Sequence, residues 1–221
     1  MSTKTANPGK DTSEQILEAA LALFRERGFA SATMRDIAAK AGVASGLAYY
    51  YFDSKEAIVL AFYQRAREDM APLLEKAHEE RTLAGRLQAL VEAKFAYFTP
   101  NRRFLGAILG HAADPASPLS PFNEASRPIR EFEFAQFDRA LQETRTRVPR
   151  DLTPHLSKML WFYQMGLLLF WIHDRSPDQR RAHELLKSSL RAVVLLIKLS
   201  NVPLFAPARR SALNIIELLD A

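Results

Sequence analysis

The chain has 221 residues, of which 48% are hydrophobic and 25% charged, a composition typical of one large globular domain or two smaller ones. It contains no cysteine, which excludes a disulfide framework, a thiolate zinc site, an iron–sulfur cluster and a cysteine nucleophile. The first ten residues lack the apolar core of a secretory signal, and no stretch approaches the roughly 20 apolar residues of a membrane span. We therefore expect a cytoplasmic protein without membrane insertion.

The net charge of +5 is unevenly distributed. Residues 1–75 contain nine cationic and ten acidic side chains, a balance of −1, whereas the rest of the chain contains 21 cationic and 15 acidic ones, a balance of +6. Because charge location matters more than the total, the composition alone does not argue for binding to nucleic acid.

Helical spacing dominates the pattern of apolar residues, and alternating strand-like runs are absent, so an all-α fold is predicted. Residues 1–10 are expected to be disordered. The first helix is predicted to begin at Thr12 or Ser13, because Thr12 and Gln15 have the spacing of a capping box, and to end at Gly28.

Two short helices follow. The first has Thr33 as its N-cap, with Asp36 near the positive end of the helix dipole, and it stops at Gly42, where the turn needs a left-handed conformation. The second covers about 45–52. A long amphipathic helix then begins near Ser54, passes residue 71 and is expected to bend at Pro72.

The remaining chain is predicted to be helical, with a loop at 114–121 that is dense in proline and serine. The predicted helices cover about 83–98, 100–112, 120–146, 152–174, 177–200 and 208–220.

Three short helices within about 45 residues, the last two joined by a tight turn with glycine, match a helix-turn-helix. Ile37, Ala48 and Phe52 are predicted to face inward. The opposite face of the third helix then presents Ser45, Leu47, Tyr49 and Tyr50, with Lys55 just beyond it.

This segment resembles the N-terminal signature of the TetR family of transcriptional regulators. The residues that carry the resemblance are Gly28-Phe29, Thr33, Ile37-Ala38, Ala41-Gly42-Val43, Gly46, Tyr49, Tyr51-Phe52 and Ser54-Lys55-Glu56. The rest of the chain agrees with the family in length and helicity.

The resemblance implies a three-helix DNA-binding domain over 1–54, joined through a long helix to a larger helical ligand-binding and dimerisation domain over 55–221. It implies a regulator, in most cases a repressor, that binds a palindromic operator in double-stranded DNA as a homodimer and responds to a small-molecule effector. No cofactor and no enzymatic activity are expected.

Carried over position by position, the resemblance assigns DNA-facing positions to Thr33, Arg35, Ser45, Gly46, Leu47, Tyr49, Tyr50, Tyr51 and Lys55. Tyr49 and Lys55 are expected to contact phosphate, while Ser45, Leu47 and Tyr50 are better placed to read bases. For Tyr51, packing in the core and a phosphate contact both remain open. The chain departs from the family at Ala44, where the helix cap is usually serine or threonine, so either Ser45 caps one position later or the helix end is less well held.

By the same resemblance, the effector would lie among helices near 95–111, 130 and 161–173. The candidate wall residues are Phe95, Phe98, Phe104, His111, Phe132, Trp161, Tyr163, Gln164 and Trp171. So many aromatic residues favour a largely hydrophobic ligand, and the surplus cations of this half leave room for an anionic head group.

A helix–helix seam is predicted along the helix 177–200, where apolar residues recur at steps of three and four. Its members are Leu186, Leu190, Val193 and Ile197. This helix and the apolar helix 152–174 resemble the pair that forms the dimer interface of the family.

No catalytic or metal-binding pattern is present. The five histidines lack metal-ligand spacing, and there is no nucleophile elbow, glycine-rich phosphate loop or HExxH motif. The alternative interpretation is a helical-bundle binding protein or enzyme in which the first three helices only pack against each other.

Overall fold

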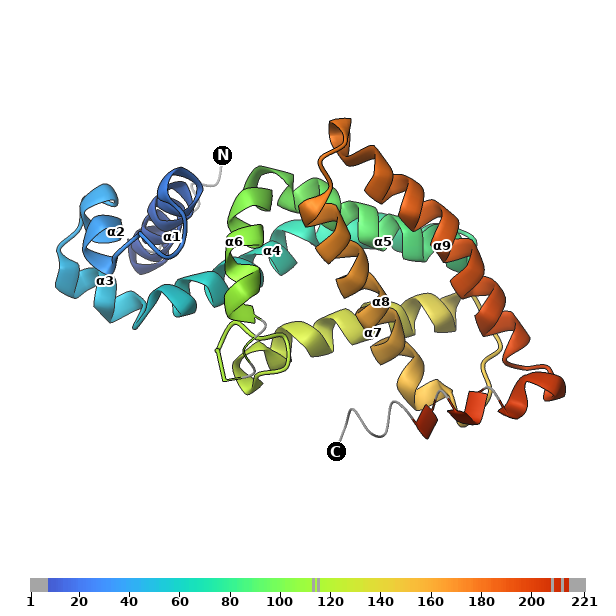
Figure 1. Ribbon diagram of the computed structural model, residues 1–221. Coiled ribbons are helices and arrows are strands. Elements are labelled where there is room, and N and C mark those ends of the chain that lie inside the picture. Colours follow the sequence, from blue (N-terminus) through green and yellow to red (C-terminus); the bar gives the residue numbers. More distant parts are fainter. Residues whose placement is uncertain (1–7, 113, 115, 208, 212, 215–221) are drawn as a thin grey trace, which may run out of the picture. The chain divides into compact units, whose positions relative to one another are not determined.

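The computed structural model describes residues 8–112, 114, 116–207, 209–211 and 213–214, and in these ranges every regular element is a helix (Figure 1). The all-α prediction is confirmed. The chain forms two compact units: unit 1 comprises Met1–Asp69 and Phe98–Ile129, and unit 2 comprises Met70–Tyr97 and Arg130–Ala221. No helix in the described ranges is both long and apolar enough to cross a membrane. The functional division predicted between residues 54 and 55 stays a prediction.

Five helices lie wholly or mainly in the described part of unit 1. They are α1 (Pro8–Arg27), α2 (Met34–Lys40), α3 (Ser45–Tyr51), the first part of α4 (Lys55–His78) and α6 (Arg102–Ala112), with the 3-10 turns η1 (Thr99–Asn101) and η2 (Glu124–Ser126).

The start of α1 differs from the prediction. The helix begins at Pro8, a residue favoured in the first helical turn, so Thr12 lies inside it and the predicted capping box is wrong. Gln15 instead donates from Nε2 to the carbonyl of Ala41, at 2.8 Å. Of the segment 1–10 expected to be disordered, residues 8–10 belong to α1, and residues 1–7 lie outside the described ranges.

An aromatic cluster forms the core of unit 1. Phe24 of α1 stacks on Phe104 of α6 with ring centroids 5.1 Å apart, and Phe62 of α4 meets Phe104 edge-on at 6.1 Å. The three rings are at most 1% exposed. Arg25 adds a hydrogen bond of 2.9 Å to the side-chain oxygen of Asn101. The first helix is therefore held by residues about 80 positions away in the chain.

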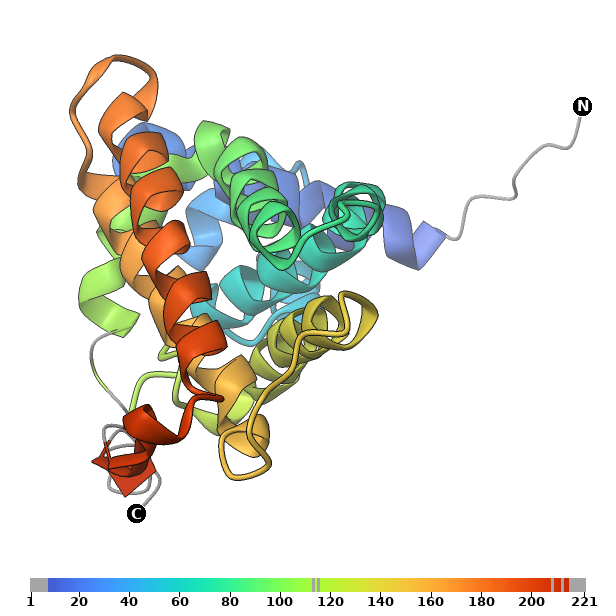
Figure 2. The same ribbon diagram turned by 90° about the vertical axis from the view of Figure 1, so that its right-hand side faces the viewer.

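Unit 2 contains the end of α4, most of α5 (Leu83–Phe98) and α7 (Arg127–Glu143), and all of α8 (Thr153–His173) and α9 (Arg180–Leu199), with the turns η3 (Pro177–Gln179) and η4 (Pro203–Phe205). Helices α8 and α9 run side by side and are joined by a short loop (Figure 1 and Figure 2). The loop is fixed by the buried Asp174, whose carboxylate accepts from the backbone N–H groups of Ser176 and Ala182, both at 2.9 Å.

Helix α7 is shorter than predicted. The chain before it turns because Asn123 accepts from the N–H of Ala125, and the hydroxyl of Ser126 donates to the carbonyls of Ser120 and Asn123. These local side-chain bonds compete with a helix, so α7 begins at Arg127 and not near residue 120. Of the helix predicted at 208–220, residues 209–211 and 213–214 are helical, and the others lie outside the described ranges.

Helix α4 continues through Pro72 to His78. Proline has no N–H to donate to the carbonyl four residues earlier, which weakens the helix at that turn. The division between the two units falls close by, after Asp69. A bend at Pro72 stays a prediction.

Candidate nucleic-acid interface

The turn between α2 and α3 is a Schellman motif. Val43 donates its N–H to the carbonyl of Ala38 at 3.0 Å, and Gly42 donates to Ala39 at 3.2 Å. The motif requires a left-handed residue, and Gly42 has φ +67°, as predicted. These bonds fix the direction in which the chain enters α3.

Thr33 is the N-cap of α2, as the sequence predicts, and together with Asp36 it forms a complete capping box. The Thr33 hydroxyl accepts from the N–H of Asp36 at 3.1 Å, and the carboxylate of Asp36 accepts from the N–H of Thr33 at 3.1 Å and from its hydroxyl at 2.7 Å. The hydrogen bonds from Thr33 lower the pKa of Asp36. The Thr33 hydroxyl predicted to face DNA is thus occupied in holding the helix.

Helix α3 has one buried face and one exposed face. Ala48 of α3 and Ile37 of α2 are fully buried, and Phe52 at the C-cap of α3 is 7% exposed, as predicted for the inward side. On the other side Leu47 is 40%, Tyr49 49% and Tyr50 79% exposed.

The other positions on the outer side of α3 are open or partly covered. Ser45 and Gly46 are exposed, and a Cβ at Gly46 would meet no atom within 4 Å. Tyr51 is half-buried and meets the Tyr50 ring edge-on at 5.3 Å. The exposed face of α3 therefore presents two tyrosines and a leucine.

The N-cap of α3 is Ala44, and no side chain caps this end. Of the two alternatives from the sequence, a cap by Ser45 is therefore not realised. The Leu47 N–H donates to the Ala44 carbonyl at 2.9 Å, which leaves the N–H groups of Ser45 and Gly46 for solvent.

Lys55 is anchored inside unit 1. Its Nζ donates to the carbonyl of Phe29 at 2.8 Å and to that of Ala30 at 3.3 Å, and it lies 4.7 Å from the centre of the Phe29 ring. The side chain ties the start of α4 to the loop between α1 and α2. Because an ammonium group has three donors, one of them remains for a phosphate.

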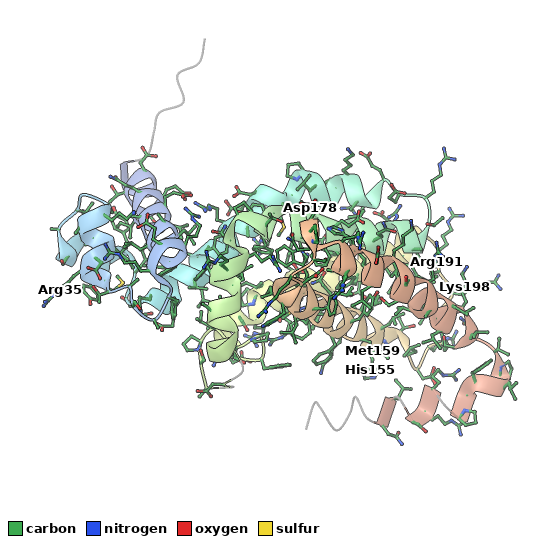
Figure 3. The ribbon with its side chains drawn as sticks, turned by 45° about the horizontal axis from the view of Figure 1, so that its top comes forward. Arg35, His155, Met159, Asp178, Arg191 and Lys198 are labelled. Carbon is green, nitrogen blue, oxygen red and sulfur yellow. The ribbon has the colours of Figure 1, made fainter. Side chains whose placement is uncertain are left out.

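The other cations around the helix-turn-helix differ in availability. Lys40 pairs with Glu26 at 2.6 Å, and its hydrogen bond lowers the pKa of that carboxyl. Arg35 is exposed and points away from the helices of unit 1 (Figure 3). Arg35 is therefore the predicted contact best placed to meet a phosphate directly.

Two residues that hold this surface were not predicted. Gln15 fixes the end of α2 through the carbonyl of Ala41, and Arg65 of α4 pairs with Glu14 and Glu18 of α1. Their partners lie 26 to 51 positions away. Spacing within one helix carries no signal for contacts of that range.

The predicted wall residues of an effector site divide between the two units. Phe98 and Phe104 belong to the aromatic core of unit 1. Phe95, Phe132, Trp161, Tyr163, Gln164 and Trp171 belong to unit 2, where Phe95 stacks on Trp171 at 5.1 Å and Trp161 meets Phe134 edge-on at 5.7 Å. The side chain of His111 lies outside the described residues. Lys94 and Glu133, which the sequence did not single out, form a buried pair at 2.8 Å beside Gln164.

The predicted seam of α9 faces the interior of the protomer. Leu186, Leu190 and Ile197 are at most 4% exposed, and only Val193 is half-exposed. Side chains buried within one protomer cannot form the surface that meets another, so an interface on α9 needs other residues.

The N-terminal part of the chain matches the family model for bacterial regulatory proteins of the tetR family over residues 16–62. The model for the tetracyclin repressor-like C-terminal domain matches residues 86–210, more than half of the chain.

Curated relatives are transcriptional regulators. The repressor KstR2 of Rhodococcus jostii is 46% identical over 61 residues, which is 25% of this chain and 30% of that protein, and TtgW of Pseudomonas putida is 41% identical over 28% of this chain and 46% of that protein. The chain thus matches less than half of the length of these two relatives. AcrR of Shigella flexneri is 23% identical over 78% of this chain and 83% of its own length.

Solved structures share the fold. A regulator from Rhodococcus sp. has a TM-score of 0.64 at 17% identity and covers 84% of this chain and 99% of its own. FadR from Bacillus halodurans has a TM-score of 0.59 at 23% identity, with 85% and 99% covered. Together with the two family models, these matches identify the chain as a member of the TetR family of transcriptional regulators, with its DNA-binding helix-turn-helix at α2 and α3.

Proposed function

We propose that this regulator is a repressor that binds a palindromic operator as a homodimer. Its affinity for DNA falls or rises when a small, largely hydrophobic molecule binds to unit 2. The observation that carries the DNA-binding part is the exposed face of α3. A helix with an aromatic outer face that is held by a Schellman turn and a capping box is suited to enter a major groove.

The exposure of Tyr50 also weighs against the alternative in which the three helices only pack together. A tyrosine that serves packing would be largely covered, whereas this one is 79% exposed. Within the proposal, Tyr49 and Arg35 bind phosphates, Tyr50 and Leu47 contact base edges, and Lys55 combines an internal role with a phosphate contact.

A homodimer surface is supported by two outer stripes on α8 and α9. On α8 the half-exposed or exposed residues at steps of three and four are His155, Met159, Tyr163, Gly166 and Phe170; on α9 they are Leu185, Ser189, Ala192, Leu196 and Leu199. A hydrogen bond of 2.8 Å between the hydroxyls of Tyr163 and Ser189 joins the stripes into one surface.

Two features of this surface favour a second helix pair as its occupant. Met159, Tyr163 and Leu196 line an apolar groove of about 350 Å³, and Leu196 is 64% exposed. A Cβ at Gly166 would meet no atom within 4 Å, so a partner helix can approach closely there. The same surface on a second copy would give an isologous twofold contact.

The test is binding to the DNA upstream of the protein's own gene. Fluorescence anisotropy with that duplex and with a scrambled duplex of equal composition should give a specific affinity that exceeds the nonspecific one by about 10³-fold or more. Footprinting should then show two protected half-sites related by a twofold axis. Equal binding to both duplexes, at every salt concentration, would count against a specific operator in this region.

A further inference from the structure

A buried polar cluster lies in unit 2 and consists of Lys94 on α5, Glu133 on α7 and Gln164 on α8. The Lys94 Nζ is 2.8 Å from the Glu133 Oε2, and the Gln164 Nε2 donates to the same oxygen at 2.9 Å. Lys94 is 3%, Glu133 9% and Gln164 2% exposed. Three helices thus converge on one buried carboxylate.

Stability does not account for this cluster. Removing two charges from water costs about as much as their attraction returns, and apolar replacements of equal volume are often neutral or stabilising. Aromatic side chains of the same three helices pack together in unit 2: Phe95 stacks on Trp171 at 5.1 Å, and Phe134 meets Trp161 edge-on at 5.7 Å. A charged group in such surroundings indicates a function that needs polarity at that point.

One atom of the cluster lacks a partner. The Gln164 Oε1 is buried and makes no hydrogen bond. The amide orientation is fixed by chemistry, because a carboxylate only accepts and so must face the Gln164 NH₂ group. The free atom is therefore an acceptor, and leaving it buried without a partner is unfavourable.

A second buried atom without a hydrogen bond is the Nδ1 of His78, a residue that is bound to Gln136, one turn after Glu133 on α7. Gln136 Oε1 accepts from the His78 Nε2 at 2.9 Å, and the His78 Nδ1 is buried without a hydrogen bond. In a neutral ring whose Nε2 carries the proton, Nδ1 is also an acceptor. The unpaired Gln164 Oε1 calls for a hydrogen-bond donor.

We propose that this cluster receives the polar end of the effector, and that the effector is a neutral, largely apolar molecule that carries a hydroxyl or N–H donor. The inference rests on the proposed effector response and specifies its chemistry. The donor would bind to the Gln164 Oε1, while aromatic residues of the same three helices contact the apolar part.

The charges of the cluster disfavour an anionic head group. Lys94 is the only lysine or arginine among the buried side chains of the described residues, and Glu133 already neutralises it. A carboxylate would meet the acceptor oxygen of Gln164 and the negative charge of Glu133. The sequence suggested that the surplus cations of the C-terminal half could bind an anionic head group. At this cluster they do not supply a free positive charge.

The test uses three probes with the same ten-carbon chain: 1-decanol, which donates a hydrogen bond, decyl methyl ether, which only accepts, and decanoate, which is anionic. Both tryptophans of the chain, Trp161 and Trp171, lie on α8 with Gln164, so their fluorescence reports binding. We expect decanol to bind about fivefold or more tightly than the ether, the effect of one hydrogen bond of about 1 kcal/mol, and decanoate to bind more weakly than decanol.

The variant Gln164→Met removes the acceptor with little change in volume and should abolish the preference for decanol over the ether. Gln142→Met, on the exposed side of α7, is the matched control and should keep it. Tightest binding of decanoate, binding of none of the probes, or an unchanged preference in Gln164→Met would overturn the inference. The comparison of the three probes on the wild-type protein decides the matter even if Gln164→Met does not fold.

Operator binding is measured on the same wild-type sample. Specific operator binding without a preference for decanol contradicts this inference alone, whereas the absence of operator binding contradicts the proposed function.

Discussion

Helices α3 and α9 both bury one face and expose the other, but their exposed faces differ in chemistry. The outer face of α3 carries hydroxyl-bearing rings, with Tyr49 and Tyr50 well exposed, whereas the exposed side of α9 carries a stripe with Leu185 and Leu196 beside charged residues such as Lys187 and Arg191. On α3 the tyrosine hydroxyls allow the exposed side to be predicted from the sequence alone. On α9 the buried stripe of Leu186 and Leu190 has an adjacent exposed stripe with Leu185 and Leu196, so only the packing within unit 2 decides which of the two stripes is free.

The largest effect is expected from a charge on the exposed face of α9. Leu196→Glu should convert the dimer to a monomer in sedimentation analysis, because burying an unpaired charge costs several kcal/mol and a twofold interface contains it twice, which lowers the dimer affinity roughly 1000-fold or more. Operator affinity should fall with it. Leu73→Glu on α4, an exposed leucine outside the two stripes, is the control and should remain a dimer. A dimeric Leu196→Glu protein would place the interface elsewhere.

The next largest effect concerns base recognition by α3. Tyr50→Ala should change the preferred operator sequence, with a loss of about 1–3 kcal/mol at the base pair that Tyr50 reads. Tyr49→Phe removes only a hydroxyl and should weaken binding by the same factor for every duplex, whatever its sequence. Binding of a randomised duplex library, followed by sequencing, separates the two results. Unaltered sequence preference in Tyr50→Ala would exclude Tyr50 from base recognition.

Lys55→Ala tests a residue with two roles. Loss of the bonds to the carbonyls of Phe29 and Ala30 should lower the melting temperature of unit 1. If Lys55 also binds a phosphate, the slope of log affinity against log salt should flatten by about 0.9 per subunit. A lower melting temperature with an unchanged slope would assign Lys55 an internal role only.

The smallest effect is expected at the exposed network of α4, α5 and α7. Hydrogen bonds from Arg139 and Arg86 lower the pKa of Glu143 to about 2, from an ordinary value of 4.5. The ionised carboxylate therefore contributes stability above about pH 4.5, and this contribution is lost as the pH falls toward about 2. The melting temperature of Glu143→Gln should lie slightly below that of the wild type at pH 6 and converge with it in acid, while Glu79→Gln should follow the wild type throughout. The difference is small because the pair is exposed to solvent.

The sequence predicted the helix-turn-helix well because short-range rules determine it. The N-cap at Thr33, the left-handed Gly42 and the inward Ala48 each depend on neighbours within a few positions. The same short-range rules gave a wrong start for the first helix. Thr12 and Gln15 have the spacing of a capping box, but the helix begins earlier, at Pro8.

Contacts between distant segments could not be predicted. Along α9, residues 186, 190, 193 and 197 and residues 185, 189, 192 and 196 have the same spacing and differ by one position, so periodicity cannot tell the inner stripe from the outer one. Phe98 and Phe104 were grouped with the effector site because they are aromatic, but they pack with Phe62 in the core of unit 1. Lys94 and Glu133 are ordinary surface residue types whose burial depends on three converging helices.

Unit 1 is built from two separate segments of the chain. This affects the order of folding during synthesis and the design of chimeric proteins. During synthesis on the ribosome, Phe24 emerges about 80 residues before Phe104, its stacking partner. The packing of the DNA-binding helices can therefore be completed only after α6 has been synthesised. A chimera joined after residue 54 would leave Phe24 without this partner, whereas an exchange of residues 1–69 together with 98–129 would transfer the whole core.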